Sequence, residues 1–473
     1  MVRDQWVGGS ILSPRTIPDF LARSENEDHW TRYYLVAMAY EDSAINAKPS
    51  QTSPVYREEE RAMRLPAAVW CLGSCLLISP FVAAQSSTTA ATPPADAAEV
   101  KQEIQQMEGL LPKLPDRGAA LFLLAHDHAH IGNLEKALSL LRECLSLDEG
   151  FDPEGDSAFG PLATDAEFRS LMERVHRHYP MVHRAHVAFT ISEKDLVPEG
   201  LAADRTGKTL YMGSLNRRKI VKITKNGDVS DFVKSGQYDL RPICGLKVEV
   251  SDESLWANTC PDDGAAAELL HFDPAGKFVE RFPPPTPGQH LFNDLVLRGR
   301  QEIYLTDSLA KRAYRFDRKS HAFTELPLCR AVYYPNGIAG SDNGDLLYVA
   351  DAFGIVELDL RDKSSHEVVP GQSSTVSGAD GLYWYRNSLI AVQNSLGSSR
   401  IAQFHLSRDG TNVTRTTILE YRSPLVALPT TGAIVGSRFY FMSNTQVDNF
   451  KGEKIVDPTK LEPVQISVVE LEN

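Results

Sequence analysis

The chain has 473 residues, more than one typical globular core holds, so two or three domains are expected. Its net charge of −13 argues against a surface for nucleic acid or anionic lipid, because such surfaces need clustered Lys and Arg. Hydrophobic content of 42% and charged content of 23% are ordinary for a soluble globular protein and indicate no substrate.

The N-terminal region carries the pattern of a secretory signal peptide. An apolar run follows Met63 and ends in small residues before Gln85. Prolines and a glycine inside the run make it a poor membrane-spanning helix, although a buried helix or an anchor is the alternative. We therefore predict a disordered upstream extension at 1–62, a signal peptide at 63–84 and a flexible linker at 85–98. The mature protein would be secreted or periplasmic, without a membrane span.

The next segment, residues 99–182, has helical periodicity. Apolar residues recur at three- and four-residue steps on both sides of Gly132-Asn133, which predicts a helix, a turn and a second helix. A further helix is predicted after Asp165. The first pair resembles a tetratricopeptide-type repeat. The residues of that pattern are Leu124, Ala125, Ala129, Gly132, Ala137 and Leu141. This small domain is expected either to dock a protein partner or to pack as a cap on the rest of the chain.

Residues 183–473 read as short β-rich runs separated by Gly, Asp and Asn, and these runs recur. Each unit starts with a strand at a residue that precedes Gly, or precedes Asp in one unit. These residues are Glu199, Cys244, Asn293, Asn336 and Asp380, which lie 45, 49, 43 and 44 residues apart. A sixth unit starts near Thr431. Such a period predicts a six-bladed β-propeller with four strands per blade.

The sixth unit reaches only three strands before the chain ends at Asn473. A spare strand around Val187 precedes the first unit. We expect this strand to pair with residues 465–471, which would complete the last blade and close the ring without an exposed sheet edge.

The innermost strand of every blade lines the central channel, so residues in the same register converge on one axis. Glu199, Asn293, Asn336 and Asp380 would bring two carboxylates and two amides together there. Each taken singly can be an ordinary turn residue, since Asn-Gly and Asp-Gly pairs are common in turns. Together, they would be costly to bury without a partner, which predicts a divalent cation.

The ligand types indicate which cation is expected. Carboxylate and amide oxygens suit Ca²⁺ first, with Mg²⁺ or Mn²⁺ next. Zn²⁺ prefers His or Cys ligands. It remains a candidate only because Cys244 occupies the same channel position in its blade. Cys244 and Cys260 are also the nearest cysteine pair after the signal peptide, so one disulfide between them is possible.

Four of these motifs together resemble the regucalcin/gluconolactonase family, also called the SMP family. They are PEGLA at Glu199, FNDLVL at Asn293, YPNGIA at Asn336 and GADGLYW at Asp380. The resemblance covers residues 187–473 and implies a six-bladed propeller with a catalytic divalent metal that hydrolyses lactones or related esters. It implies that Glu199, Asn336 and Asp380 are metal ligands, and that Asn293 is a ligand or a substrate-side group. The metal would polarise the carbonyl group, and Asp380 would activate the attacking water.

Two residues depart from the family pattern. Sugar-lactone members carry Arg at the position of Leu291, and the more distant paraoxonases carry a catalytic His at the position of Cys244. The main alternative to a hydrolase is therefore a binding or scaffold propeller with a structural Ca²⁺.

Four further residues invite a site assignment. Asp307 and Asp351 follow the second strands of their blades and would either face the channel or cap turns. His126 and His130 lie one helical turn apart, but no third ligand is evident, so helix packing is the favoured interpretation.

Overall fold

The computed structural model describes residues 97–261 and 266–473. The predicted extension, the signal peptide and almost all of the predicted linker lie outside these ranges. The described residues belong to one compact unit. No helix among them is both long and apolar enough to cross a membrane.

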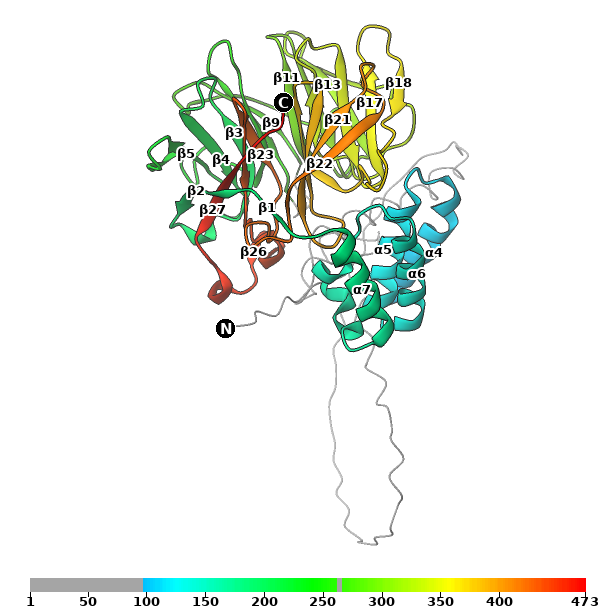
Figure 1. Ribbon diagram of the computed structural model, residues 1–473. Coiled ribbons are helices and arrows are strands. Elements are labelled where there is room, and N and C mark those ends of the chain that lie inside the picture. The colour runs from blue at the N-terminus through cyan, green and yellow to red at the C-terminus, as the bar shows by residue number, and fades with distance from the viewer. Residues whose placement is uncertain (1–96, 262–265) are drawn as a thin grey trace, which may run out of the picture. The chain divides into compact units, whose positions relative to one another are not determined.

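The first described part is helical and precedes the strands (Figure 1). Its elements are α4 (Ala97–Leu110), η1 (Leu111–Lys113), α5 (Arg117–His130), α6 (Leu134–Ser146), η2 (Pro153–Gly155), η3 (Ser157–Leu162) and α7 (Ala166–His178). Asp116 and Asp165 cap α5 and α7, because each carboxylate accepts a hydrogen bond from a backbone N–H of the first turn. The resemblance of this segment to a tetratricopeptide repeat stays a prediction.

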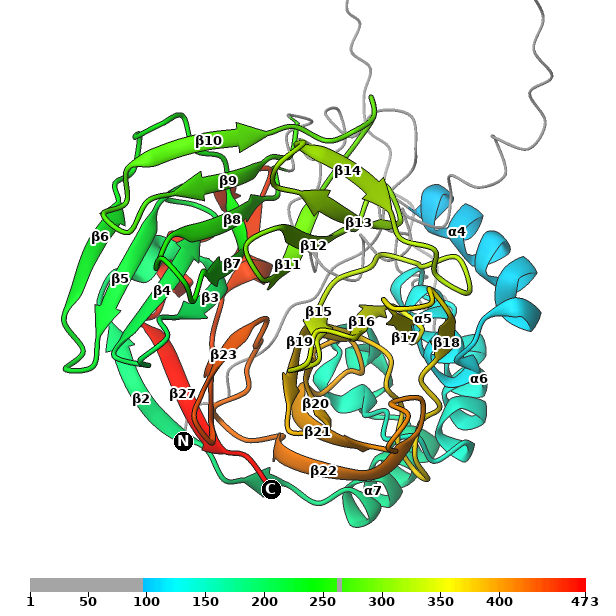
Figure 2. The ribbon, with the colours of Figure 1, turned by 90° about the horizontal axis from the view of Figure 1, so that it is seen from above.

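The rest of the chain forms six blades around a channel, each built on four main strands, as the sequence period predicts (Figure 2). The strands of the first three blades are β3 (Pro198–Ala203), β4 (Thr209–Ser214), β5 (Ile220–Thr224), β6 (Val229–Val233); β7 (Ile243–Val248), β8 (Leu255–Thr259), β9 (Leu269–Phe272), β10 (Phe278–Phe282); β11 (Phe292–Arg298), β12 (Glu302–Asp307), β13 (Arg312–Asp317) and β14 (Ala322–Glu325). All neighbouring strands within these blades are antiparallel.

The remaining blades repeat this order. Their strands are β15 (Ile338–Gly340), β16 (Leu346–Asp351), β17 (Gly354–Asp359), β18 (Ser365–Glu367); β19 (Ala379–Tyr385), β20 (Ser388–Gln393), β21 (Arg400–Leu406), β22 (Val413–Tyr421); β23 (Gly432–Val435), β24 (Arg438–Met442), β27 (Val464–Glu470) and β2 (His186–Ile191). Short elements between the last strands and near the start are η4 (Lys194–Leu196), η5 (Val447–Asn449), β25 (Phe450–Lys451), β26 (Lys454–Ile455) and η6 (Pro458–Lys460).

The ring closes as expected from the spare strand. β2 pairs antiparallel with β27, and Val187 lies opposite Ser467. The first strand of the propeller is thus the outermost strand of its last blade, which removes a free edge. A feature that the sequence did not predict is β1 (Val182–His183), which adds a fifth strand outside β22 in blade five.

The innermost strands of neighbouring blades lie so close together that the residue after the channel residue is favoured to be glycine. A Cβ on Gly245 would lie 2.6 Å from the carbonyl oxygen of Asn293 in the next blade. A Cβ on Gly337 would lie 2.6 Å from the backbone nitrogen of Leu382 and 2.7 Å from the oxygen of Asp380. Backbone atoms cannot move aside at such distances, so the Gly that follows the channel residue in five of the six blades allows the ring to be narrow.

The helical part joins blade five through a polar seam. The backbone of Asp152 receives a hydrogen bond from the N–H of Ser398 and donates one to Leu396, both at 3.0 Å. The Asp152 carboxylate accepts a hydrogen bond from the Tyr421 hydroxyl at 2.7 Å. The buried guanidinium of Arg400 donates to the carbonyl of Gly150 at 3.2 Å. These contacts fasten the loop before η2 to the end of blade five that carries Asp380.

Candidate metal centre

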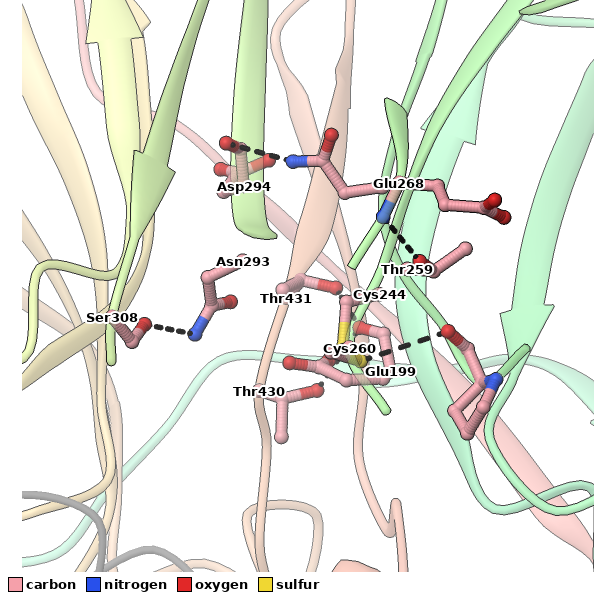
Figure 3. The surroundings of a disulfide bond; sticks show 12 residues. Glu199, Cys244, Thr259, Cys260, Glu268, Asn293, Asp294, Ser308, Thr430 and Thr431 are labelled. Carbon is pink, nitrogen blue, oxygen red and sulfur yellow. Dashed lines mark hydrogen bonds between the residues drawn. A yellow bond between two sulfur atoms is a disulfide. The ribbon is translucent and has the colours of Figure 1, made fainter. Parts of the chain in front are cut away.

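The four predicted ligands all lie at the inner strands of their blades. Glu199, Asn293 and Asp380 are in β3, β11 and β19, and Asn336 lies two residues before the start of β15. Each is only 1% exposed, so the group is shielded from bulk water. Figure 3 shows two of them, Glu199 and Asn293, together with the neighbouring Asp294.

A backbone irregularity marks this level of the channel. The pairing register of the inner strand with the second strand shifts at Pro198/Leu201, Ile243/Leu246, Phe292/Leu295 and Ala379/Gly381. A β-bulge inserts an extra residue and turns a side chain away from its normal alternation. Because the shift recurs at one level in four blades, it directs the residue at that level toward the channel in each of them.

Several oxygen atoms at this level have no hydrogen-bond partner. These are both carboxylate oxygens of Glu199, Oδ1 of Asp380 and Oδ1 of Asn336, and the Asn336 nitrogen is likewise without one. Buried polar atoms are normally paired, and leaving them unpaired is costly. Their convergence fits a cation with oxygen ligands, so the residues present fit the metal that the family resemblance implies.

The electrostatics of the two carboxylates are coupled. Burial and the charge of Asp380 raise the pKa of Glu199 well above its usual range, and the nearby hydroxyl of Thr430 offsets this only in part. Burial raises the pKa of Asp380 to about 7, although the hydrogen bond from Asn394 and the nearby amide of Asn336 act in the opposite direction. The site therefore resists holding two negative charges at neutral pH without a cation.

In blades three and five, the residue after the second strand donates a hydrogen bond to the channel residue. The Asn293 amide donates to the Ser308 hydroxyl at 3.1 Å, and its oxygen points the other way (Figure 3). The Asn394 amide donates to Oδ2 of Asp380 at 2.7 Å.

In two blades this position is apolar. Leu215 follows β4, and Ala352 follows β16. Glu199 and Asn336 are therefore left without such a partner, and these are the two residues whose side-chain oxygens are all unpaired. The sequence analysis did not identify Ser308 or Asn394.

At the channel position of blade two, the corresponding pair is covalent. Cys244 and Cys260 form a disulfide, as the sequence had made possible (Figure 3). The sulfur of Cys244 is thus not available as a thiolate ligand. This removes the only reason to consider Zn²⁺ as the metal of this site. Cys144 and Cys329 are the free cysteines of the described residues.

Asp307 and Asp351 do not supply open ligands to the channel. Asp307 accepts hydrogen bonds from the backbone N–H of Leu291 at 3.0 Å and of Ala310 at 3.2 Å. Asp351 accepts from the N–H of Tyr333 at 2.9 Å and of Phe353 at 3.0 Å. The turn-capping interpretation is therefore the one that the structure supports.

Asp307 and Asp351 also each contact an ionisable side chain, which further supports a structural role. His290 Nδ1 lies 2.5 Å from Asp307, and Arg330 forms two hydrogen bonds to Asp351 at 2.5 and 3.0 Å. In the helical part, His126 is buried in α5 with Nδ1 2.7 Å from Asp156, which agrees with helix packing.

A second cluster of ligand-type groups lies at the seam with blade five. One ligand atom each from Asp152, Glu154 and His176 lies within 4.8 Å of the others. Arg422 already contacts both carboxylates, at 3.3 Å from Asp152 and at close range from Glu154. A guanidinium that contacts both carboxylates accounts for this cluster as an ion-pair network of the seam.

Comparison with known proteins gives matches among solved structures only. No protein-family model matches it, and no curated protein matches it. Among solved structures, a virginiamycin B lyase from Staphylococcus aureus is 16% identical over 55% of this chain and 81% of its own, with a TM-score of 0.40. A gluconolactonase from Xanthomonas campestris is 15% identical over 60% of this chain and 89% of its own, with a TM-score of 0.43.

A third solved structure is the PQQ-bound aldose sugar dehydrogenase from Streptomyces coelicolor. It is 13% identical over 60% of this chain and 97% of its own, with a TM-score of 0.45. Structural similarity with such low identities and TM-scores gives no information about the reaction. The class of the protein, a six-bladed β-propeller, is defined by its own strand pairing.

Proposed function

We propose that this protein is a metal-dependent hydrolase of lactones or related esters. The observation that carries the proposal is the group of buried, unpartnered oxygens from Glu199, Asn336 and Asp380 at one level of the channel. These residues stand in the motifs that resemble the regucalcin/gluconolactonase family. The substrate would be a small lactone or ester.

Four residues would hold the cation: Glu199, Asn293, Asn336 and Asp380. A bound divalent cation, Ca²⁺ in first place, would draw electron density from the substrate carbonyl oxygen and stabilise the negative charge that develops there. Asn293 would present its oxygen because Ser308 holds its nitrogen.

Asp380 would act as the base. The carboxylate has two oxygens, so one can ligate the cation while the other accepts a proton from water. Water would attack the carbonyl carbon while its proton passes to Asp380. The C–O bond of the ester would then break, and the same proton would return to the leaving oxygen. Asn394 would keep the carboxylate in place through its bond to Oδ2.

The test combines metal analysis with turnover. Purified protein is stripped with chelator, reloaded with Ca²⁺, Mg²⁺, Mn²⁺ or Zn²⁺, and assayed on a panel of lactones and aryl esters. Asp380→Asn is expected to lose about 10²-fold or more in rate. Glu199→Gln should mainly weaken metal binding, so excess metal should partly restore its rate. As a control, Asp273→Asn alters an exposed turn-capping carboxylate and should change neither property.

One observation favours the scaffold alternative, in which Ca²⁺ is structural. The position that carries a catalytic His in paraoxonases holds Cys244, and this side chain is locked in a disulfide. A scaffold would bind metal without chelator-sensitive turnover of any lactone or ester. That result, with the metal site full, would contradict the hydrolase.

We also propose that the protein is exported and begins near Gln85 after cleavage. The Cys244–Cys260 disulfide supports this, because disulfides persist in oxidising compartments outside the cytosol. Intact-mass measurement of the exported protein is the test. A mass that includes residues 63–84 would contradict both the cleavage and the compartment.

A further inference from the structure

The position next to the predicted ligands is glycine in five blades and aspartate in one. The glycines are Gly200, Gly245, Gly337, Gly381 and Gly432, and the exception is Asp294 in β11. The Thr306 hydroxyl bridges the gap to blade four by donating to the Asn336 carbonyl at 2.6 Å.

Asp294 is buried beside the candidate metal centre and is only half paired. Its Oδ1 accepts hydrogen bonds from its neighbour's N–H at 2.8 Å and from the Lys247 ammonium at 3.0 Å. Its Oδ2 is buried and has no hydrogen-bond partner. The charge of Asp294 acts on both Glu199 and Asp380. The channel therefore contains a third carboxylate, which the proposed reaction does not use.

Lys247 brings a positive charge to this carboxylate. It lies on β7, three residues after Cys244, and the strand irregularity at Ile243/Leu246 precedes it. Its Nζ atom is also 5.4 Å from the ring centroid of Tyr383, a distance at which a cation–π interaction is favourable. Tyr383 is held in turn, because its hydroxyl accepts a hydrogen bond from the Gly432 N–H at 2.7 Å.

From this arrangement we infer that Lys247 neutralises Asp294 and thereby sets the charge that the metal centre presents to its cation. The ammonium balances one of the three carboxylates. The two that are left, Glu199 and Asp380, match the charge of one divalent ion. Buried charges need such compensation, since each uncompensated one costs several kcal/mol. Lys247 and Asp294 are thus positioning residues that act through the ligands. The inference rests on the proposed metal site.

A double-mutant cycle tests this pair with Ca²⁺ alone as the probe. Calcium affinity is measured by titration calorimetry on chelator-treated full-length protein at pH 7.5. Asp294→Asn leaves the ammonium unbalanced beside the site, so its affinity should fall by about tenfold or more. Lys247→Met leaves the Asp294 carboxylate uncompensated beside the site, so it should bind Ca²⁺ more tightly than wild type. The double variant has the wild-type net charge and should return to within about threefold of wild type.

The rescue separates charge balance from other roles. A double variant as weak as Asp294→Asn would show that Asp294 is itself a ligand or a structural group, and would overturn the inference. Melting temperatures in chelator identify any variant that fails to fold. If Asp294→Asn does not fold, tighter binding by Lys247→Met than by the double variant is the expected result, and equal binding overturns the inference.

The control is Lys219→Met, which removes a buried lysine whose partners, Glu193 and Asp231, lie outside the channel. Its calcium affinity should equal that of wild type. A wild type that binds none of Ca²⁺, Mg²⁺, Mn²⁺ or Zn²⁺ would overturn the proposed function itself. A wild type that binds one ion, together with a failed rescue, would overturn only the role of Lys247.

Discussion

Buried carboxylates occur in two settings at the inner ends of the blades, and burial alone does not distinguish them. Glu199 and Asp380 are 1% exposed, and Asp307 and Asp351 are 0% exposed. Asp307 and Asp351 each accept two backbone N–H groups and contact a cationic or ionisable side chain. Glu199 has no well-formed hydrogen bond at all, and Asp380 keeps Oδ1 free. Carboxylates with a full set of partners stabilise loops, whereas those with open oxygens can bind a ligand.

The cost of each arrangement has a different origin. Asp351 is buried among matched donors, so losing it would leave the mostly buried Arg330 with only Glu367 as an ionic partner. Burial and nearby negative charge raise the pKa of Asp380. Without a cation, the first carboxylate should therefore stabilise the fold and the second should oppose it.

The largest expected effect comes from replacing one carboxylate of each kind. In chelator at pH 8, Asp351→Asn should lower the free energy of unfolding by about 3–5 kcal/mol, because it breaks a buried ion pair. Asp380→Asn should raise it by on the order of 1 kcal/mol or more, since it removes a buried charge. Chemical denaturation of both variants beside wild type measures the difference. Equal destabilisation by the two substitutions would remove the distinction drawn between them.

The disulfide is intermediate between the two kinds of carboxylate. It lies at the same level of the channel as the predicted ligands, but its role is structural. Cys244 and Cys260 are separated by 16 residues, and closing a loop of that size stabilises a protein by about 3 kcal/mol. Replacing both cysteines with alanine should lower the free energy of unfolding by up to that amount. The calcium stoichiometry should not change. A loss of bound calcium in a folded variant would instead make the disulfide part of the metal centre.

The sequence was most informative where a feature repeats. A spacing of 43 to 49 residues predicted six blades, and the unpaired strand around Val187 predicted the closure with β27, which the structure confirms. The partners of the channel residues also repeat, because Cys260, Ser308 and Asn394 lie 16, 15 and 14 residues after theirs. That spacing is a signal that the sequence analysis could have used.

Features that occur only once could not be found in this way. Lys247 and Asp294 lie 47 residues apart in different blades, and the seam hydrogen bond between Asp152 and Tyr421 spans 269 residues. No period or short motif links such residues, since only the closed ring brings them together. The turn-capping role of Asp307 also depends on loop geometry, which residue type alone does not determine.

The smallest expected effect is a pH dependence of the stability that the Asp307–His290 pair contributes. Burial alone would lower the pKa of His290, but the hydrogen bond and charge of Asp307 raise it overall above 6.5. A raised histidine pKa contributes stability that is complete below pH 6.5 and is lost as the pH rises through the folded-state pKa. Asp307→Asn should therefore destabilise more at pH 6 than at pH 9, by about 1 kcal/mol.

The raised pKa of Asp380 also makes stability fall with pH, but over a lower window, from its usual 3.8 to about 7. The two contributions are separated by comparing Asp307→Asn with wild type at each pH, because Asp380 is present in both proteins and cancels. Chelator is included throughout so that no metal alters the Asp380 titration. The same loss of stability at pH 6 and pH 9 would mean that Asp307 acts through its backbone hydrogen bonds alone, and that His290 stays neutral beside it.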